Sequence, residues 1–244
     1  MTVLFIHGVP DTHRLWAPVL DHLPDGDYSC PDLPGFGRGA PQGFSFTMDA
    51  YAAWLEAELE DAAAEGPVHL VGHDWGGLLV QRVGGLRPDL VKSWAAGGVA
   101  IDEAYEWHDI AQIWQTPGEG EALMEAMDEA AFAEALTAAR VPQDKAAEMA
   151  RHGDEAMRAA ILTLYRSAVT IGDQWAPALA GLNEAGPGLV LWGEHDPYAG
   201  PAFGQRLAAR TGARFHMFED CGHWWPYERA EATAAMLKAH WEQS

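Results

Sequence analysis

Short apolar runs recur along the chain, and each one is followed by glycine, proline or aspartate. The runs are residues 2–8, 28–35, 67–74, 91–99, 188–196 and 213–223. Each is continuous rather than alternating, which is typical of strands buried on both faces of a parallel sheet. Segments with helical periodicity lie between them, namely residues 47–66, 76–90 and 200–212. This order predicts an α/β fold with an open, mainly parallel sheet of about six strands.

The alternation stops between residues 100 and 185. This segment has no convincing strand pattern but several helical stretches rich in alanine and glutamate, including residues 121–140 and 154–172. The segment begins and ends beside predicted strands that carry polar residues at their ends. This position favours a lid over the sheet rather than a second, independent helical domain. We therefore expect a core domain of residues 1–99 and 186–244, and a helical cap domain of residues 100–185.

The composition limits the class of partner. The chain has 36 acidic and 15 basic residues, a net charge of −21, and such a surface repels nucleic acid and anionic membranes. Two cysteines make no disulfide framework, and no apolar run approaches the roughly 20 residues of a membrane span. The first residues lack a signal-peptide pattern. We expect a cytoplasmic monomer or homodimer that binds neither nucleic acid nor membrane.

Polar residues suited to catalysis follow four of the predicted strands. The first strand ends in His7-Gly8-Val9-Pro10, and Asp74 follows the third. Asp196 follows the fifth strand, and His223 lies in a loop after the sixth. The carboxyl ends of parallel strands share one edge of the sheet, where ligands of open α/β sheets bind. The chain order of nucleophile, acid and histidine is the one found in α/β-hydrolases.

Asp74 stands in the middle of the segment LVGHDWGG, residues 70–77. The spacing of Gly72, Asp74 and Gly76 matches the G-x-S-x-G nucleophile elbow, a strand–turn–helix unit, with aspartate in place of serine. Glycines here permit backbone strain and close approach, neither of which a simple helix cap requires. We interpret Asp74 as a nucleophile.

The resemblance to a known family rests on five motifs. They are HGVPDTHRLW (7–16), DLPGFG (32–37), GHDWGG (72–77), WGEHDPY (192–198) and CGHWWP (221–226). They resemble the α/β-hydrolase superfamily along nearly the whole chain, and within it the epoxide hydrolases and haloalkane dehalogenases. The resemblance implies Asp74 as nucleophile, His223 as base and Asp196 as the acid that orients it. It implies the α/β-hydrolase fold without its usual N-terminal antiparallel strand pair.

Aspartate suits a different reaction from serine. A carboxylate is already ionised near neutral pH, so it can attack a saturated carbon without a base and form an alkyl ester. Histidine is then needed only in the second step, to activate water against the carbonyl of that ester. The oxyanion would form on Asp74, where the backbone N–H groups of Val9 and Trp75 are placed to donate.

The leaving group depends on donors in the cap. Residues 162–168, LTLYRSA, resemble the epoxide-hydrolase segment that holds one epoxide-polarising tyrosine, which here is Tyr165. The partner tyrosine is expected near Ile110, where this sequence has none. Tyr105, Trp107 and His108 are the nearby alternatives.

A halide would need weak N–H donors instead. Trp75 follows the nucleophile, where a halide-binding tryptophan lies in dehalogenases, but epoxide hydrolases often carry tryptophan there as well. A second donor, asparagine in many dehalogenases, is replaced by Val9, so Trp107 or Trp114 would have to substitute. Trp75 also replaces the arginine of fluoroacetate-specific relatives. Together with eleven tryptophans and the negative charge, this favours a small, neutral, apolar substrate.

We therefore expect a hydrolase that converts an epoxide to a vicinal diol through an ester on Asp74, with water as the second substrate. The alternatives are a haloalkane dehalogenase with the same nucleophile, and a catalytically silent binding protein on the same fold. Neither a cofactor nor a metal is expected.

Overall fold

The computed structural model describes residues 2–243 and contains a six-stranded sheet in the order β2-β1-β3-β4-β5-β6. The strands are β1 (Thr2–Ile6), β2 (Asp27–Ser29), β3 (Val68–His73), β4 (Val91–Gly97), β5 (Gly188–Gly193) and β6 (Arg214–Phe218). Every neighbouring pair is parallel. The predicted sheet is confirmed, although β2 is shorter than the apolar run of residues 28–35.

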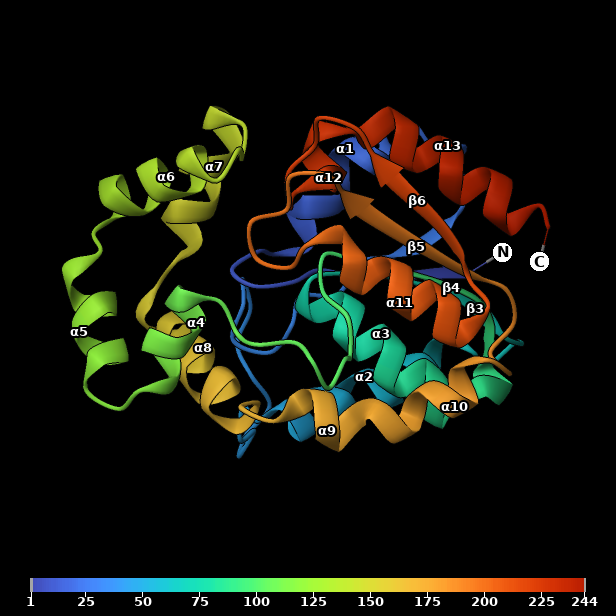
Figure 1. Ribbon diagram of the computed structural model, residues 1–244, viewed down its shortest axis with the longest axis horizontal. Helices are drawn as coiled ribbons and strands as arrows, with labels where there is room; N and C mark the ends of the chain where they lie inside the picture. Colours follow the sequence, from blue (N-terminus) through green and yellow to red (C-terminus); the bar gives the residue numbers. More distant parts are fainter. Residues whose placement is uncertain (1, 244) are drawn as a thin grey trace.

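Helices cover both faces of this sheet (Figure 1). One face carries α2 (Met48–Ala62), α3 (Trp75–Leu86) and α11 (Pro201–Thr211), and the other carries α1 (Ala17–Leu20), α12 (Trp225–Glu228) and α13 (Ala230–Trp241). Short 3₁₀ turns precede α1 and β4, at His13–Trp16 and Pro88–Leu90. Within the described residues, no helix is long and apolar enough to cross a membrane.

The strands feed two cores because their side chains alternate between faces. In β1, Leu4 and Ile6 join the cluster beneath α2 and α3, whereas Val3 and Phe5 join the cluster beneath α13. Every one of these four side chains is at most 1% exposed. This double burial explains why the strands are continuously apolar in sequence.

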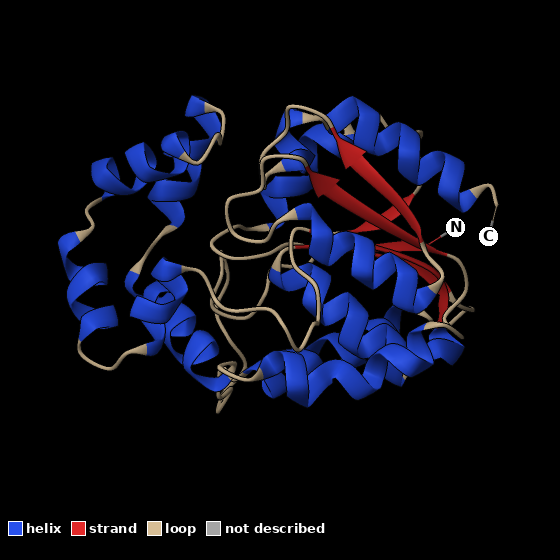
Figure 2. Ribbon diagram, viewed as in Figure 1, coloured by secondary structure: helices blue, strands red, loops and turns tan. Residues whose placement is uncertain are grey.

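The segment between β4 and β5 is helical in the described residues, as predicted. It contains α4 (Asp109–Gln115), α5 (Glu119–Ala126), α6 (Glu129–Ala138), α7 (Gln143–His152), α8 (Glu155–Ser167), α9 (Ile171–Trp175), a 3₁₀ turn (Ala176–Ala178) and α10 (Leu179–Leu182). The stretch 121–140 is not one helix. The helix α5 ends at Ala126, and Asp128 caps α6 by accepting a hydrogen bond from the Ala131 N–H at 2.8 Å. Figure 2 shows α4 to α8 gathered on one side of the sheet.

The helices α4 to α8 form a layer beyond the strand ends, whereas α9 and α10 lie along α2 and α3 (Figure 1). We keep the proposed cap of residues 100–185, with the observation that its last part packs on the core. Ion pairs link the layer to the core: Arg140 lies 3.3 Å from Glu228, and Arg14 lies 3.1 Å from Glu148.

Candidate active site

The polar residues predicted from the strand ends lie together at the carboxyl edge of the sheet. Asp74 follows β3, Asp196 follows β5, and His223 follows β6. All three are buried, with exposed fractions of 7, 8 and 2%. Residues from three separate parts of the sequence therefore meet in one site.

Asp74 occupies a sharp turn between β3 and α3. Its backbone has φ +53° and ψ −123°, a conformation that non-glycine residues rarely adopt. Its side chain makes no capping hydrogen bond to α3, which removes the interpretation of Asp74 as a helix cap. Instead, Asp74 Oδ1 accepts a hydrogen bond from the Val9 N–H at 2.8 Å.

The turn requires small neighbours. A Cβ added to Gly8 would lie 2.4 Å from the Asp74 Cβ, and one added to Gly76 would lie 2.1 Å from the Ile6 carbonyl oxygen. Both positions must be glycine for the loop after β1 to approach Asp74 this closely. Trp75 follows as the first residue of α3, where backbone N–H groups have no acceptor within the helix. Of the two expected oxyanion donors, the Val9 N–H contacts the Asp74 carboxylate, and Trp75 is the next residue along the chain.

His223 is fixed from two sides. Its Nδ1 lies 2.8 Å from Asp196 Oδ2, and Asp196 Oδ1 in turn accepts hydrogen bonds from the N–H groups of Tyr198 and Ala199. On the other side, His73 Nε2 donates to the His223 carbonyl oxygen at 2.9 Å. Burial lowers the pKa of His73 to about 3, so that ring stays neutral and acts as a fixed donor.

The charges of the site stabilise an ion pair. Burial alone would lower the pKa of His223, but the neighbouring charge and hydrogen bond of Asp196, followed by those of Asp74, raise it to about 10. Burial would raise the pKa of Asp74, yet the His223 cation outweighs this and lowers it. At neutral pH, His223 is therefore protonated and Asp74 is a carboxylate, with Nε2 and Oδ2 3.6 Å apart.

A cavity lies between this edge of the sheet and the cap. Its wall includes Val9, Pro10, Asp74, Tyr198, His223 and Trp224 from the core, and His108, Ile110, Trp114, Met127, Phe132, Ala135, Leu136 and Tyr165 from the cap. Apolar side chains predominate, with a few polar groups near Asp74, as is typical of small-molecule sites.

Comparison with known proteins now identifies the family. The profile of the alpha/beta hydrolase family matches residues 3–236. This chain belongs to that family. Among its relatives, a haloalkane dehalogenase of Bradyrhizobium diazoefficiens is 25% identical over 89% of this chain and 82% of that protein. Lipase LipV of Mycobacterium tuberculosis is 42% identical, but the match covers only 36% of this chain and 33% of the lipase.

An epoxide hydrolase of Caballeronia sordidicola is 34% identical over 37% of this chain and 30% of that protein. Among solved structures, haloalkane dehalogenase DbeA from Bradyrhizobium elkani has a TM-score of 0.75 and 24% identity, covering 100% of this chain and 91% of that one. These findings confirm an enzyme of the α/β-hydrolase fold with dehalogenase and epoxide-hydrolase relatives.

Tyr165 is a cap residue of this hydrolase that lies on the wall of the cavity. It belongs to α8 and is 3% exposed. Burial and then the charge of Asp74 raise its pKa well above the ordinary value, so the hydroxyl keeps its proton at neutral pH. Its ring packs against Trp75 and Trp114, with centroids 5.5 and 4.9 Å away.

Other predicted donors are placed differently. The Trp107 indole N–H donates to the Ala168 carbonyl at 2.9 Å, so it is not free to hold a leaving group, and its ring packs behind Tyr165. The Tyr105 hydroxyl donates to the Tyr198 carbonyl at 3.3 Å. Ile110 lines the cavity but has no donor group. The Trp75 indole does not form part of the cavity wall, although its backbone lies beside Asp74.

His108 is a second candidate donor on the cap side. It caps α4, with Nδ1 accepting a hydrogen bond from the Ala111 N–H at 3.3 Å. Burial lowers its pKa to about 4, so the ring is neutral and its proton resides on Nε2. The ring lies on the cavity wall, which makes Nε2–H a candidate donor toward a ligand.

Tyr198 is a cavity residue that sequence reasoning missed. Its ring lies 5.0 Å from the His223 ring and 4.8 Å from the His108 ring. Burial and then the charge of Asp196 raise its pKa to about 12. The available signal was its place two residues after Asp196, which puts it at the same strand end as the acid.

Proposed function

We propose that this hydrolase attacks a saturated carbon with Asp74 and converts an epoxide to a vicinal diol. The observation that carries the proposal is the arrangement of Asp74 between the Val9 N–H on one oxygen and His223 facing the other, with Asp196 behind His223. Dehalogenase and epoxide-hydrolase relatives support the same chemistry.

In the first step, Asp74 Oδ2 is the attacking oxygen, because Oδ1 is held by Val9. A bond forms between Oδ2 and an epoxide carbon as the ring C–O bond breaks, and the electron pair moves to the epoxide oxygen. That oxygen takes the proton of the Tyr165 hydroxyl. The ester no longer carries the Asp74 charge, so the pKa of His223 falls and its proton returns through water to the tyrosinate.

In the second step, neutral His223 accepts a proton from water through Nε2, and the resulting hydroxide adds to the Asp74 carboxyl carbon. The oxyanion develops on Oδ1, where Val9 already donates and Trp75 is adjacent. Collapse of this intermediate breaks the bond to the alkyl oxygen, which takes the proton from His223. Asp74 then returns its own proton to His223, and the resting ion pair is restored.

The cavity donors favour an epoxide. A developing alkoxide needs hydrogen-bond donors of which one can release a proton, and Tyr165 is such a group. His108 Nε2–H can strengthen this contact as a neutral donor, and the Tyr198 hydroxyl lies on the same wall. Small charged substrates are disfavoured because the wall is mainly apolar.

The second candidate is a haloalkane dehalogenase. The indole N–H of Trp114 is buried, makes no hydrogen bond among the described residues and belongs to a side chain on the cavity wall. Such weak N–H donors suit a departing halide. The same attack by Asp74 would then release halide in place of an alkoxide.

The test is a matched panel of 1,2-epoxyalkanes and 1-bromoalkanes, with diol and bromide measured in parallel. The proposal expects diol from the wild type and none above background from Asp74→Asn. Bromide release without diol would favour the dehalogenase over the epoxide hydrolase. If no member of the panel gave either product, both candidate functions would be overturned.

A further inference from the structure

Arg140 of the cap has a backbone conformation that favours glycine. It lies two residues beyond the end of α6, with φ +75°. Its N–H donates to the Thr137 carbonyl oxygen, and the Val141 N–H donates to the Leu136 carbonyl oxygen, both at 3.0 Å. These two hydrogen bonds close the end of a helix, and the left-handed residue between them is usually glycine because a Cβ is strained there. An arginine in this place points to a role for its side chain.

The Arg140 side chain reaches from the cap to the loop that carries His223. We call residues 219–224, between β6 and α12, the histidine loop. Arg140 Nη2 donates to the Asp220 carbonyl oxygen at 2.9 Å and to the Asp220 carboxylate at 3.0 Å. The same carbonyl oxygen accepts a hydrogen bond from Arg229 of the core at 2.7 Å. A cap side chain and a core side chain therefore hold one backbone group of the histidine loop.

Glu228 extends this contact to the residue before His223. Arg140 Nε lies 3.3 Å from Glu228 Oε2, and Glu228 Oε1 accepts a hydrogen bond from the Gly222 N–H at 2.9 Å. A Cβ on Gly222 would lie 3.1 Å from Arg140 Cδ, so the arginine packs directly on this part of the loop. Isolated surface ion pairs contribute little, but the Glu228 side chain is only 10% exposed and is bonded through both oxygens. The Glu228 carboxylate therefore connects the cap to the backbone beside His223.

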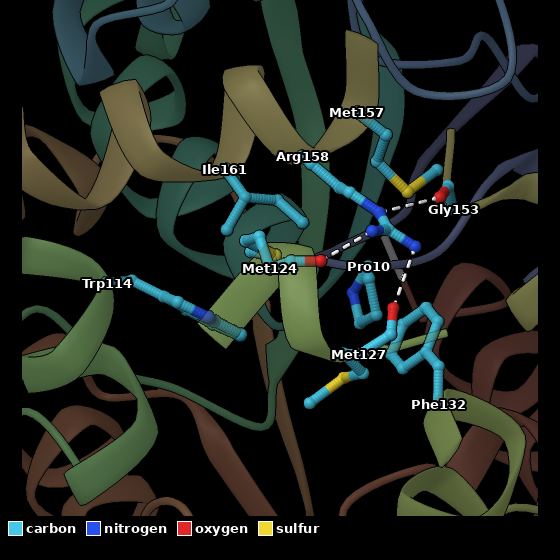
Figure 3. Close-up of a pocket in the computed structure, with 9 residues that line it drawn as sticks. All are labelled: Pro10, Trp114, Met124, Met127, Phe132, Gly153, Met157, Arg158 and Ile161. Carbon is cyan, nitrogen blue, oxygen red and sulfur yellow. Dashed lines mark hydrogen bonds between the residues drawn. The ribbon is translucent and has the colours of Figure 1, made fainter. Parts of the chain in front are cut away.

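The cap that carries Arg140 is braced internally. Figure 3 shows that the Arg158 guanidinium of α8 donates to three carbonyl oxygens, those of Gly153, Met124 and Met127. These hydrogen bonds join the end of α5 to α8. Phe132 of α6 packs on the same turn, since a Cβ on Gly153 would lie 3.0 Å from its ring. Tyr165 also belongs to α8. The layer of helices that carries Tyr165 is therefore the one that carries Arg140.

We propose that Arg140 is a positioning residue of the cap, which holds the histidine loop so that His223 can activate water in the second step. This inference rests on the proposed function and adds a residue on which only the second step depends. Asp74 attacks as a carboxylate and Tyr165 supplies the proton, so ester formation needs no base. Ester hydrolysis needs the His223 ring beside the water. Loss of the Arg140 side chain should therefore slow hydrolysis and spare formation.

The test compares Arg140→Gly with Arg14→Ala. Glycine suits the backbone at position 140, so this variant removes the guanidinium without adding strain. Arg14 is the matched control, because it pairs with Glu148 of α7 at 3.1 Å and is 42% exposed, against 43% for Arg140. Its loss breaks an ion pair between core and cap that does not include the histidine loop.

Rapid-quench measurements with 1,2-epoxyhexane give the rates of ester formation and ester hydrolysis separately. In Arg140→Gly, hydrolysis should slow roughly 10- to 100-fold and formation should change less than about twofold, since a misplacement of about 1 Å costs about 100-fold in the step that it affects. Arg14→Ala should keep both rates. Unchanged hydrolysis in Arg140→Gly would overturn the inference. An equal fall in both steps would also overturn it, because Arg140 would then only seat the cap, and Tyr165 with it.

Hydrogen exchange separates this inference from the proposed function, because it needs no substrate. Peptides that cover residues 219–224 should exchange faster in Arg140→Gly than in the wild type, and at the wild-type rate in Arg14→Ala. If they do so and no epoxide or bromoalkane reacts with the wild type, the proposed function fails and the hold of Arg140 on the histidine loop stands. If the wild type forms diol but exchange is equal in wild type and Arg140→Gly, the proposed function stands and the inference is overturned.

Discussion

His223 Nε2 lies 3.6 Å from Asp74 Oδ2, while its Nδ1 lies 2.8 Å from Asp196 Oδ2. The imidazole is thus held between two carboxylates, and its pKa is raised to about 10. Alkylation of Asp74 would remove one of these charges. In the proposed mechanism, the base of the second step therefore becomes available only after Asp74 has reacted.

Asp74→Asn imitates the neutral ester, so it should lower the pKa of His223 by roughly 1–3 units. The measurement is an NMR titration of ¹⁵N-labelled histidine in both proteins. Asp25→Asn, at an exposed position, is the control and should leave the wild-type value. Equal His223 pKa values in wild type and Asp74→Asn would show that Asp74 does not govern its proton.

Asp11 should make stability depend on pH. It is 1% exposed, accepts a hydrogen bond from the Trp224 indole at 2.9 Å, and has a pKa raised by burial from 3.8 to about 7. Between these values the folded protein keeps a proton that the unfolded chain releases, so the free energy of unfolding falls as pH rises.

Asp11→Asn removes this contribution. Relative to the variant, the wild type should lose roughly 2–4 kcal/mol of unfolding free energy between pH 4 and pH 8. Urea unfolding at several pH values measures the difference. Parallel profiles for the two proteins would show that Asp11 ionises normally.

Gly8→Ala should disable the site, because its Cβ would lie 2.4 Å from the Asp74 Cβ. A displacement of the nucleophile by about 1 Å is enough to reduce turnover about 100-fold. Gly39→Ala is the matched control, since nothing lies within 4 Å of a Cβ at that position. Turnover of both variants at the wild-type rate would refute the tight approach of the two loops.

Tyr165→Phe removes the proposed proton donor. Epoxide opening should slow by roughly 10²–10⁴-fold, the usual contribution of a general acid. Tyr28→Phe is the control, because its hydroxyl donates to the Pro24 carbonyl outside the site. Rapid-quench measurement of ester formation gives the rate, and a loss below threefold would transfer the role to another donor.

Sequence reasoning could bring the core of the candidate site together because the strand-end rule depends on local pattern. Each of Asp74, Asp196 and His223 directly follows a recognisable strand or glycine-marked loop, and parallel strands bring their ends to one edge. The cap follows no such rule. The directions in which the side chains of Trp107, His108 and Tyr165 point depend on how α4 and α8 pack. The 3.6-residue period of a helical sequence does not encode that packing.

His108 illustrates this limit. From the sequence alone, His108 is one of several possible donors near residue 110. Only its position as the cap of α4 assigns Nδ1 as acceptor and leaves Nε2–H for the cavity. Tyr198 was missed for a related reason: the hydroxyl donors were sought in the cap, whereas this one comes from the core.

The most direct test of the central claim is to trap the ester. His223→Gln cannot activate water, so reaction with 1,2-epoxyhexane should leave a stable adduct on the peptide that contains Asp74, detected by mass spectrometry as one added epoxide mass. The double variant Asp74→Asn, His223→Gln should carry none. Absence of any adduct from folded His223→Gln, across both the epoxide and the bromoalkane panels, or an adduct on another peptide, would contradict nucleophilic attack by Asp74.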